Sequence, residues 1–423
     1  MAGRRDFIKA GSLILLAAGK LASALAGAQS VNPGIIEDSK LTKLLAGIQP
    51  FGREDYQQRW QKAWKLISEN STGALFVEPG PTMQYFTGVN WWRSERTFGF
   101  LLFPEREPVW ICPAFELDRA RELVDEAQEI RTWEEHESPF AVIRKTCRDY
   151  ARVKRIALEP STRSFIFYGL RKDAGDFELV DGSAVTDGCR GQKTEKEITC
   201  LEAANRITKL AYREAFRRIK EGMTQEELAG YIREAHARLG VTGSGSPSLG
   251  PASSYPHGSR KRKNIESGDI ILVDGGCRVE GYNSDVTRTL VFGRTTDLQK
   301  RIWETVRRAQ LAALRACRPG VACEEVDRAA RKVIEEAGFG PGYKYFSHRL
   351  GHGIGLEGHE YPYLVAGNKL KIQPGMTFSN EPGIYLPGEF GIRIEDCMVV
   401  TEDGARILGG MEALSLEEPF GED

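Results

Sequence analysis

The feature that most constrains the fold of this chain is a repeat in its second half. The segment EGMTQEELAGYIREAHARLG (221–240) aligns with PGVACEEVDRAARKVIEEAG (319–338), and five of the twenty aligned positions are identical. Each segment has the apolar spacing of a helix, follows another long predicted helix, and precedes a glycine-rich stretch with histidine and then strands. Because a repeated order of elements indicates a duplicated unit, we expect two structurally equivalent halves.

The first half ends in a predicted β-hairpin that carries two aspartates. In DIILVDGGCRVEGYNSDVTRTLVF (269–292), strand patterns lie on both sides of a short turn. If the turn is centred between Val279 and Glu280, Asp274 lies opposite Asp285, although a bulge could shift this register by one residue. Asp274 directly follows the apolar run IILV, so we expect its strand to be buried.

The second half ends in a similar hairpin that carries two glutamates. In MTFSNEPGIYLPGEFGIRIEDCMVV (376–400), a turn centred on Gly388 brings Glu381 opposite Glu395. Directly opposed carboxylates repel each other, because paired Cβ atoms are only about 4.5–5.5 Å apart. Two such pairs in two equivalent halves therefore predict a shared cation rather than exposed acidic ladders.

Three of the six histidines lie close together in the sequence. His348, His352 and His359 fall within SHRLGHGIGLEGHEYPY (347–363), among glycines that let the backbone approach an ion or a substrate closely. Four carboxylates and one or more imidazoles can hold two divalent ions about 3.5–4 Å apart, the spacing of two-metal hydrolytic sites. Oxygen and nitrogen ligands without a thiolate fit Mn²⁺, Co²⁺, Fe²⁺ or Zn²⁺, of which we expect Mn²⁺.

These segments resemble a known family. The motifs LVDGG, YNSDVTRT, GHGIGLEGHE, SNEPGIY and GIRIED are similar to those of the M24 metallopeptidases, which have the pita-bread fold. Within that family the resemblance is to Xaa-Pro dipeptidases (prolidases) and Xaa-Pro aminopeptidases, over residues 257–400. The preceding region resembles the creatinase-type N-terminal domain. The resemblance implies an α+β fold, with a smaller α/β domain at 45–190 before a pita-bread catalytic domain at 194–415.

The resemblance also implies a set of metal ligands for two divalent ions. By position in the motifs, the ligands are Asp274, Asp285, His352, Glu381 and Glu395. In the family pattern, Asp285 and Glu395 would bridge the two ions. No ligand of the family pattern is missing from this chain, which favours an enzyme over a member that has lost catalysis.

Four further roles follow from the same resemblance. His257 and His359 match histidines on the substrate side, where they would stabilise the tetrahedral oxyanion. Glu381 would accept a proton from the attacking water and later deliver one to the leaving nitrogen. Arg393 lies two residues before Glu395, so strand alternation places both side chains on one face. Arg393 would orient Glu395 by charge-assisted hydrogen bonds. His348 matches a histidine common among prolidases, and its role is left open between the metal rim and a structural contact.

The implied reaction is hydrolysis of the peptide bond that precedes proline. The sequence leaves open whether the substrates are Xaa-Pro dipeptides or longer peptides with a proline in second place. Two alternatives also remain: a catalytically inactive pita-bread binding protein, and a hydrolase of a small amide that is not a peptide. The intact ligand set argues against an inactive binding protein. Only substrate profiling distinguishes a hydrolase of a small amide from a peptidase.

Partners are predicted from charge and from the resemblance. Lys and Arg number 58 against 59 Asp and Glu, a balance that favours neither nucleic acid nor an anionic membrane as a partner. The family resemblance implies a homodimer or a larger assembly, in which the N-terminal domain of one subunit helps to close the site of another. The segment Trp91–Arg96 is our candidate for that edge.

The first 28 residues have the pattern of an export signal. Paired arginines at Arg4 and Arg5 precede an apolar run at 10–19, which is shorter than the roughly 20 residues of a membrane span. Small residues then end at Ala28, where we expect cleavage. Arg4-Arg5 followed by Phe7 resembles the twin-arginine motif, so we expect a periplasmic or otherwise exported protein, with an ordinary Sec signal as the alternative.

Other residues are predicted to be structural. The eight cysteines contain no C-x-x-C pair, and we expect most of them to be buried and unpaired. Thr194 and Glu197 have the spacing of a capping box, which predicts a helix start just after the domain boundary. His136 lies in a charged stretch and His236 in a helical one, and we expect both at the surface.

Overall fold

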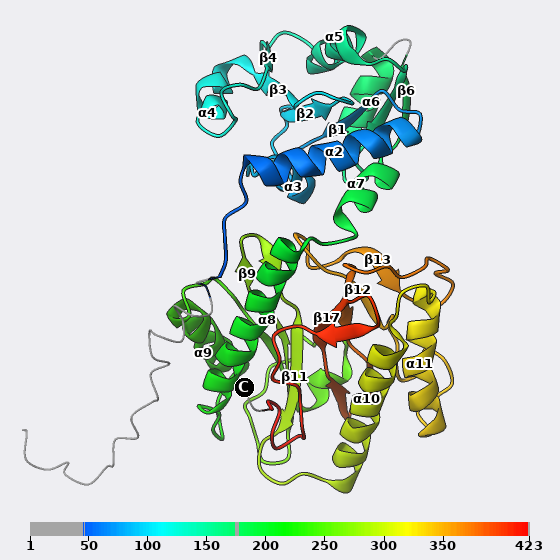
Figure 1. The fold of residues 1–423 in the computed structure, drawn as a ribbon. Helices are drawn as coiled ribbons and strands as arrows, with labels where there is room; N and C mark the ends of the chain where they lie inside the picture. Colours follow the sequence, from blue (N-terminus) through cyan, green and yellow to red (C-terminus); the bar gives the residue numbers. More distant parts are fainter. Residues whose placement is uncertain (1–44, 46, 174–176, 422–423) are drawn as a thin grey trace, which may run out of the picture. The chain divides into compact units, whose positions relative to one another are not determined.

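The computed structural model, drawn in Figure 1, describes residues 45, 47–173 and 177–421. The predicted signal peptide at 1–28 lies outside the described residues. Within the described part of the chain, no helix combines the length and the apolar character needed to cross a membrane.

The region before Gly191 is built on a mixed six-stranded sheet. Its strand order is β4-β3-β2-β1-β5-β6, with β1, β5 and β6 parallel and β1, β2 and β3 antiparallel. The strands are β1 (Ala74–Val77), β2 (Gly99–Leu102), β3 (Val109–Pro113), β4 (Ile130–Trp133), β5 (Arg155–Leu158) and β6 (Glu178–Asp181). The helices are α2 (Arg53–Glu69), α3 (Pro81–Thr87), α4 (Leu117–Arg121), α5 (Pro139–Tyr150), α6 (Ser164–Asp173) and α7 (Ser183–Arg190), and a short 3-10 turn (Ala114–Glu116) precedes α4.

Periodicity accounts for much of this region. Helix α2 buries Trp60, Ala63 and Ile67, which lie on one face because they are three or four residues apart. Strands β2 and β3 pair antiparallel on either side of the charged turn at residues 104–107. Between β3 and β4, the 3-10 turn leads directly into the short helix α4.

The second region contains two small sheets and their covering helices. One sheet has the order β11-β8-β7, the other β13-β12-β14-β17-β18, and β9 with β10 and β15 with β16 form two-stranded ribbons. The helices are α8 (Glu195–Phe216), α9 (Gln225–Arg238), α10 (Asp297–Ala316) and α11 (Cys323–Glu336). The strands are β7 (Ser246–Leu249), β8 (Ile270–Gly275), β9 (Arg278–Val279), β10 (Tyr282–Asn283), β11 (Val286–Val291), β12 (Gly351–Gly353), β13 (Glu360–Leu364), β14 (Thr377–Asn380), β15 (Gly383–Leu386), β16 (Phe390–Arg393), β17 (Asp396–Val400) and β18 (Ala405–Ile407).

The predicted repeat is confirmed at the level of helices. Helix α9 spans residues 225–238, and adding the alignment offset of 98 gives 323–336, which are the bounds of α11. Helix α9 packs against α8, and α11 packs against α10. The capping box that starts α8 is also confirmed, because Thr194 Oγ1 accepts a hydrogen bond from the backbone N–H of Glu197.

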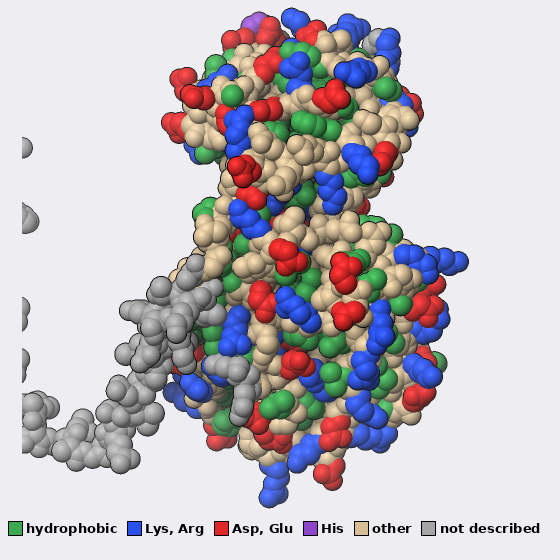
Figure 2. Space-filling view, viewed as in Figure 1, with side chains coloured by type: hydrophobic (Ala, Val, Ile, Leu, Met, Phe, Trp, Pro, Cys, Tyr) green, Lys and Arg blue, Asp and Glu red, His purple; other side chains and the backbone are tan. Residues whose placement is uncertain are grey.

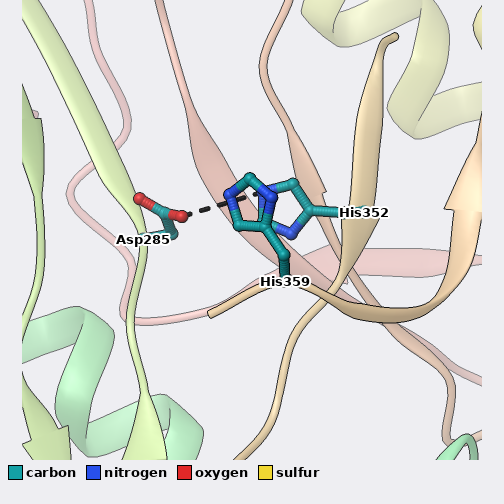
Figure 3. A group of neighbouring side chains, drawn as sticks. All are labelled: Asp285, His352 and His359. Atoms are coloured by element: carbon teal, nitrogen blue, oxygen red, sulfur yellow. Dashed lines mark ion pairs between the residues drawn. The ribbon is translucent and has the colours of Figure 1, made fainter. Parts of the chain in front are cut away.

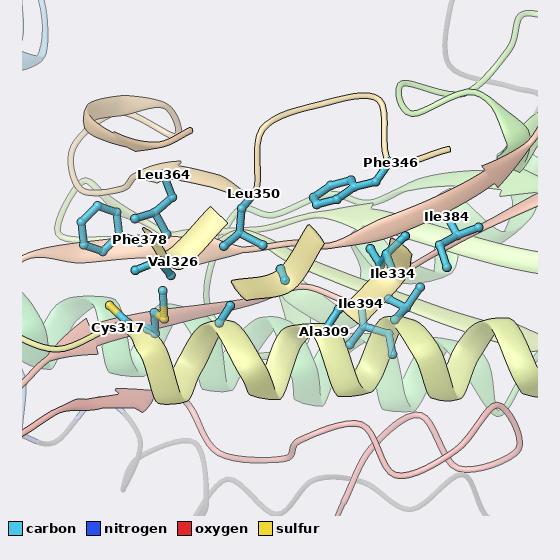
Figure 4. Packing of buried hydrophobic residues seen from close by; sticks show 14 of the residues in the cluster. Ala309, Cys317, Val326, Ile334, Phe346, Leu350, Leu364, Phe378, Ile384 and Ile394 are labelled. Carbon is cyan, nitrogen blue, oxygen red and sulfur yellow. The ribbon is translucent and has the colours of Figure 1, made fainter. Parts of the chain in front are cut away.

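An apolar core joins α10 and α11 to the sheet that carries the histidine-rich segment. Figure 4 shows Phe346, Leu350 and Phe378 packed over the two helices, with Ile394 and Cys317 in the same cluster. All eight cysteines are buried and free, as the sequence predicts for most of them. Because this core is fully buried, it fixes the positions of the strand ends that reach the site.

The surface carries both signs of charge. On the face drawn in Figure 2, Lys and Arg side chains are interspersed with Asp and Glu side chains. This mixture matches the nearly balanced composition of the chain.

Candidate metal centre and active site

The aspartate hairpin has a different register from the one predicted. Strands β8 and β11 pair Asp274 with Thr287, not with Asp285. The turn lies at Glu280 and Gly281, which both have positive φ, at 49° and 85°. A two-residue hairpin turn favours positive φ at both central residues, so the turn centre falls one position later than expected. Asp274 and Asp285 are therefore diagonal neighbours rather than directly opposed.

The glutamate hairpin has the predicted register. The pairs Asn380–Asp396 and Gly383–Arg393 lie on either side of Glu381 and Glu395. The two glutamates therefore face each other in the gap between the β14–β17 ladder and the β15–β16 ribbon. This opposition is confirmed because the turn is centred on Gly388, whose φ of 79° suits glycine.

The structure brings the five predicted ligands into two groups of three. Asp274, Asp285 and Glu395 offer ligand atoms that all lie within 4.8 Å of one another, and so do His352, Glu381 and Glu395. Glu395 belongs to both groups, so it is the side chain placed to join two ions. The structure shows that these five side chains lie close together. Their roles as metal ligands stay a prediction from the motifs.

The electrostatics of these groups fit divalent cations. Burial and the nearby Asp274 carboxylate raise the pKa of Asp285, and burial and the Asp285 carboxylate raise the pKa of Glu395. Burial also opposes ionisation of Glu381, yet the hydrogen bond from His352 and the charge of His348 hold its pKa at about 2. So many buried carboxylates cannot all be ionised without a cation, and bound divalent ions would remove that penalty.

Hydrogen bonds orient the carboxylates. Thr287 Oγ1 donates to Glu395 Oε2 at 2.7 Å, and Ser379 Oγ donates to Glu381 Oε1 at 3.1 Å. The sequence analysis did not select either hydroxyl. The available signal for Thr287 was its position two residues after Asp285, which places both side chains on one face of the strand.

The predicted contact of Arg393 with Glu395 is wrong. Arg393 Nη2 donates to Asp274 Oδ2 at 2.7 Å, and its Nε donates to Thr287 Oγ1 at 3.1 Å. The guanidinium therefore holds Asp274 directly and reaches Glu395 only through the threonine hydroxyl. Thr287 occupies the place beside Glu395 because β11 forms a bridge to the backbone of Glu395, so the arginine extends past it to the neighbouring hairpin.

The three clustered histidines have different surroundings. His359 stacks on His352 with ring centroids 3.6 Å apart, and both approach Asp285 in a third group of possible ligands (Figure 3). His348 Nε2 lies 2.8 Å from the hydroxyl of Tyr385, and its Nδ1 lies 3.9 Å from Glu381. His348 thus lies at the rim of the metal groups with a partner of its own.

All predicted site residues line one cavity. Its volume is about 340 Å³, and it is lined by Pro256, His257, Asp274, Asp285, His348, Arg349, His352, His359, Glu381, Arg393 and Glu395. His257 is exposed at the cavity wall. The cavity is large enough for a dipeptide and concentrates all the titratable groups named above.

Arg349 is a site residue that the sequence analysis missed. Its guanidinium lies 4.4 Å over the ring of Tyr363, and Nη2 lies 3.4 Å from His359 Nδ1. In the described part of the chain no carboxylate lies within ion-pair distance of it, whereas Arg393 is paired with Asp274. Its position beside His348 in the motif was the one available signal.

The two histidines outside the site differ from each other. His136 is exposed, as predicted. The surface position predicted for His236 is wrong: the residue is fully buried, and its Nδ1 lies 2.9 Å from the carbonyl oxygen of Ile232. His236 falls on the inner face of α9, four residues after Ile232, and burial lowers its pKa.

Comparison with known proteins identifies the class to which this fold and site belong. Residues 199–402 match the description "Metallopeptidase family M24", and residues 59–192 match "Creatinase/Prolidase N-terminal domain". The chain is 34% identical over 359 residues to an Xaa-Pro dipeptidase of Lactobacillus helveticus, covering 83% of this chain and 94% of that protein.

Solved structures agree with this class. The dipeptidase PepE from Mycobacterium ulcerans has a TM-score of 0.80 at 32% identity, over 86% of this chain and 97% of that one. A prolidase from Thermococcus sibiricus has a TM-score of 0.76 at 29% identity, over 84% of this chain and 97% of that one.

The chain belongs to metallopeptidase family M24. It combines a creatinase/prolidase-type N-terminal domain with a pita-bread catalytic domain and is a metallopeptidase, so the fold and family expected from the motifs are confirmed.

Proposed function

We propose that this metallopeptidase is an Xaa-Pro dipeptidase with two divalent ions in its site. The observation that carries the proposal is the pair of ligand groups that share Glu395 in one cavity with His257 and His359. The relatives named Xaa-Pro dipeptidase and prolidase support the substrate class.

The proposed metal is Mn²⁺, held by Asp274, Asp285, His352, Glu381 and Glu395. When bound, two such ions supply Lewis acidity and a water of lowered pKa. Oxygen donors with a single imidazole suit Mn²⁺, while the same donors also accept Co²⁺, Fe²⁺ or Zn²⁺.

The protein groups around the ions would carry the remaining chemistry. Glu381 is ionised in the metal-free state, so it can accept a proton and return one to the departing proline nitrogen. An N–H of Arg349 points at His359 Nδ1, so a neutral His359 carries its own hydrogen on Nε2. Together with His257, that N–H could donate to the developing oxyanion.

The preference for a dipeptide is argued from Arg349. A terminal proline in a dipeptide carries a free carboxylate, and Arg349 is a permanent cation on the cavity wall that has no acidic partner among the described residues. Its guanidinium lies over the ring of Tyr363, and the N–H groups that do not point at His359 could bind a planar carboxylate. An aminopeptidase would instead have to accept a chain that continues past proline.

The test is hydrolysis by the Mn²⁺-loaded protein of Ala-Pro, Ala-Ala, Ala-Pro-amide and Ala-Pro-Ala. We expect rapid cleavage of Ala-Pro alone, and loss of the preference over the amide in Arg349→Met. Equal rates on Ala-Pro and Ala-Pro-Ala would indicate an aminopeptidase. Cleavage of none of the four would leave a binding protein or a hydrolase of another amide.

We further propose that the protein is exported through the twin-arginine route and acts as a homodimer. The export proposal is based on Arg4 and Arg5, which lie outside the described residues. The dimer proposal is based on the segment at Trp92, whose side chain is 44% exposed although it stacks on Trp91 with ring centroids 4.6 Å apart. Large exposed aromatic side chains are enriched in protein interfaces.

A further inference from the structure

Helix α11 carries a buried ion pair that faces the segment leading into β12. Arg331 Nε donates to Asp327 Oδ2 at 2.7 Å, and Arg331 Nη2 lies 3.1 Å from Oδ1. Arg331 is 8% exposed and Asp327 is 1% exposed. A pair four residues apart on a helix surface contributes little to stability, and burying it adds a desolvation cost. The role of the ion pair must therefore be sought in the other hydrogen bonds that Asp327 and Arg331 form.

Those remaining bonds go to the backbone that carries His348. Arg331 Nη1 donates to the carbonyl oxygen of Phe346 at 2.8 Å, and Nη2 donates to the carbonyl oxygen of His348. The backbone N–H of Leu350 donates to Asp327 Oδ1 at 2.9 Å. Arg331 Nη1 also lies 3.4 Å from the carbonyl oxygen of Gly342. The ion pair thus bonds to four backbone groups, three of them within residues 346–350, in a segment that forms neither helix nor strand.

Leu350 connects this segment to one half of the metal centre. Its carbonyl oxygen accepts the backbone N–H of Glu381 at 3.0 Å. Two residues later, the N–H of His352 donates to Ser379 Oγ, which donates in turn to Glu381 Oε1. The ion pair is therefore linked to Glu381 through Leu350 alone, and to His352 through Leu350 and Gly351.

The other half of the centre has no such link. Asp274 and Asp285 lie at the hairpin of β8 and β11, and within the described chain neither member of the α11 pair bonds to that hairpin. A disturbance of the pair should therefore reach the His352–Glu381 group first.

The internal repeat provides a comparison within the same molecule. Arg331 is one of the five identical positions, and its equivalent on α9 is Arg233. The equivalent of Asp327 is Ala229, and Arg233 is exposed. The arginine alone does not produce a buried contact, so the ion pair belongs only to the half that carries the histidine segment.

We propose that the Asp327–Arg331 pair is the positioning device for the His352–Glu381 half of the metal centre. It acts through the backbone of residues 346–350, whose carbonyl and N–H groups it holds. The inference rests on the dinuclear site proposed above. It states that the affinity for one of the two ions depends on the ion pair of α11.

The double variant Asp327→Asn with Arg331→Met isolates this role. Asparagine keeps an oxygen acceptor for the N–H of Leu350, and the variant leaves no unpaired buried charge behind. It removes the guanidinium that holds the carbonyl groups, together with the negative charge that the guanidinium neutralises. Substitution of such supporting residues typically weakens metal binding about 10–100-fold.

The experiment is calorimetric titration of the metal-free full-length chain with Mn²⁺, repeated with Co²⁺ while its visible absorption is recorded. We expect wild type to bind two equivalents. The double variant should bind the first as wild type does and the second about 10–100-fold more weakly, with an altered Co²⁺ spectrum for that ion. The matched control Arg233→Met should titrate as wild type.

A second variant distinguishes the proposed effect from misfolding of the protein. Arg331→Lys keeps the charge beside Asp327, but one ammonium group cannot hold both carbonyl groups, so the second ion should again bind more weakly than in wild type. If both variants bind both ions with wild-type affinity, the positioning role is wrong, while the dinuclear site still stands. Equal loss of affinity for both ions would also contradict the positioning role, because it indicates general destabilisation. A wild-type protein that binds fewer than two ions would overturn the dinuclear centre, and the inference with it.

Discussion

At the scale of single residues, Asp285 is the proposed ligand whose loss should be most damaging. It belongs to the group with Asp274 and Glu395 and also to the group with the two stacked histidines. We expect Asp285→Asn to lose both metal retention and peptidase activity, because the neutral amide is a much weaker ligand. Metal analysis after gel filtration, alongside a dipeptide assay, measures both. Exposed His136→Ala is the control, and an Asp285→Asn protein with full metal and turnover would contradict the assignment.

His359 is the residue whose loss should affect the chemical step. If its Nε2–H stabilises charge that develops only in the transition state, His359→Ala should lower kcat by about 10²–10³-fold and change KM much less. Steady-state kinetics on Ala-Pro and Gly-Pro with saturating Mn²⁺ provide the test. An unchanged kcat would remove His359 from the chemistry and leave it as a stacking partner of His352.

At the scale of elements, a buried acidic residue joins β13 to the end of α7 and to the segment that follows it. Glu360 accepts hydrogen bonds from Lys193 Nζ at 2.7 Å and from Arg190 Nη2 at 2.5 Å. Burial opposes its ionisation, but Lys193 and Arg190 lower its pKa below the ordinary value. A carboxylate with a lowered folded-state pKa contributes stability above its unfolded pKa of about 4.3. That contribution is lost as the pH falls through the folded-state pKa.

Glu360→Gln should therefore destabilise the protein in a pH-dependent way. At pH about 7, breaking a buried pair should lower the free energy of unfolding by about 3–5 kcal/mol. At a pH below the lowered folded-state pKa, where the carboxylate is protonated in both the folded and the unfolded state, the difference from wild type should narrow. Urea unfolding of the metal-free proteins at the two pH values measures this. Glu357→Gln, at a side chain that is 41% exposed, is the control, and a difference independent of pH would contradict the account.

At the scale of the whole molecule, export can be tested on the N-terminal arginines. If the twin-arginine interpretation holds, Arg4→Lys together with Arg5→Lys should leave the precursor inside the cell, because that route reads the arginine pair. Cell fractionation followed by immunoblotting gives the distribution. Normal accumulation of the double variant outside the cytoplasm would assign the signal to the Sec class.

Self-association can be tested on the exposed aromatic segment. Trp92 stacks on Trp91 and lies under the guanidinium of Arg119, 4.4 Å from its ring. A charge at the centre of an apolar contact is unfavourable, so Trp92→Glu should shift a dimer to monomer in sedimentation velocity. Exposed Phe167→Glu on α6 is the control. A dimer that persists in Trp92→Glu would exclude this segment from the interface.

The sequence by itself determined the features that depend on local periodicity and turn chemistry. The spacing of apolar residues was sufficient for the equivalence of α9 and α11, and a glycine at the turn was sufficient for the register of Glu381 and Glu395. The same logic placed the centre of the aspartate turn one position too early. The partner of Asp274 was therefore wrong by two residues, Thr287 instead of Asp285.

Only the tertiary structure decided which partner each long or buried side chain selects. Arg393 bonds to Asp274 instead of Glu395, and Arg331 bonds to a segment fifteen residues further along the chain, at Phe346. His236 is buried although its helix has polar residues on both sides of it. These outcomes depend on which surfaces meet when helices and sheets pack. A long, flexible side chain can reach several polar groups, and the sequence does not indicate which of them it will bind. Periodicity fixes the face of an element, whereas packing selects the contact.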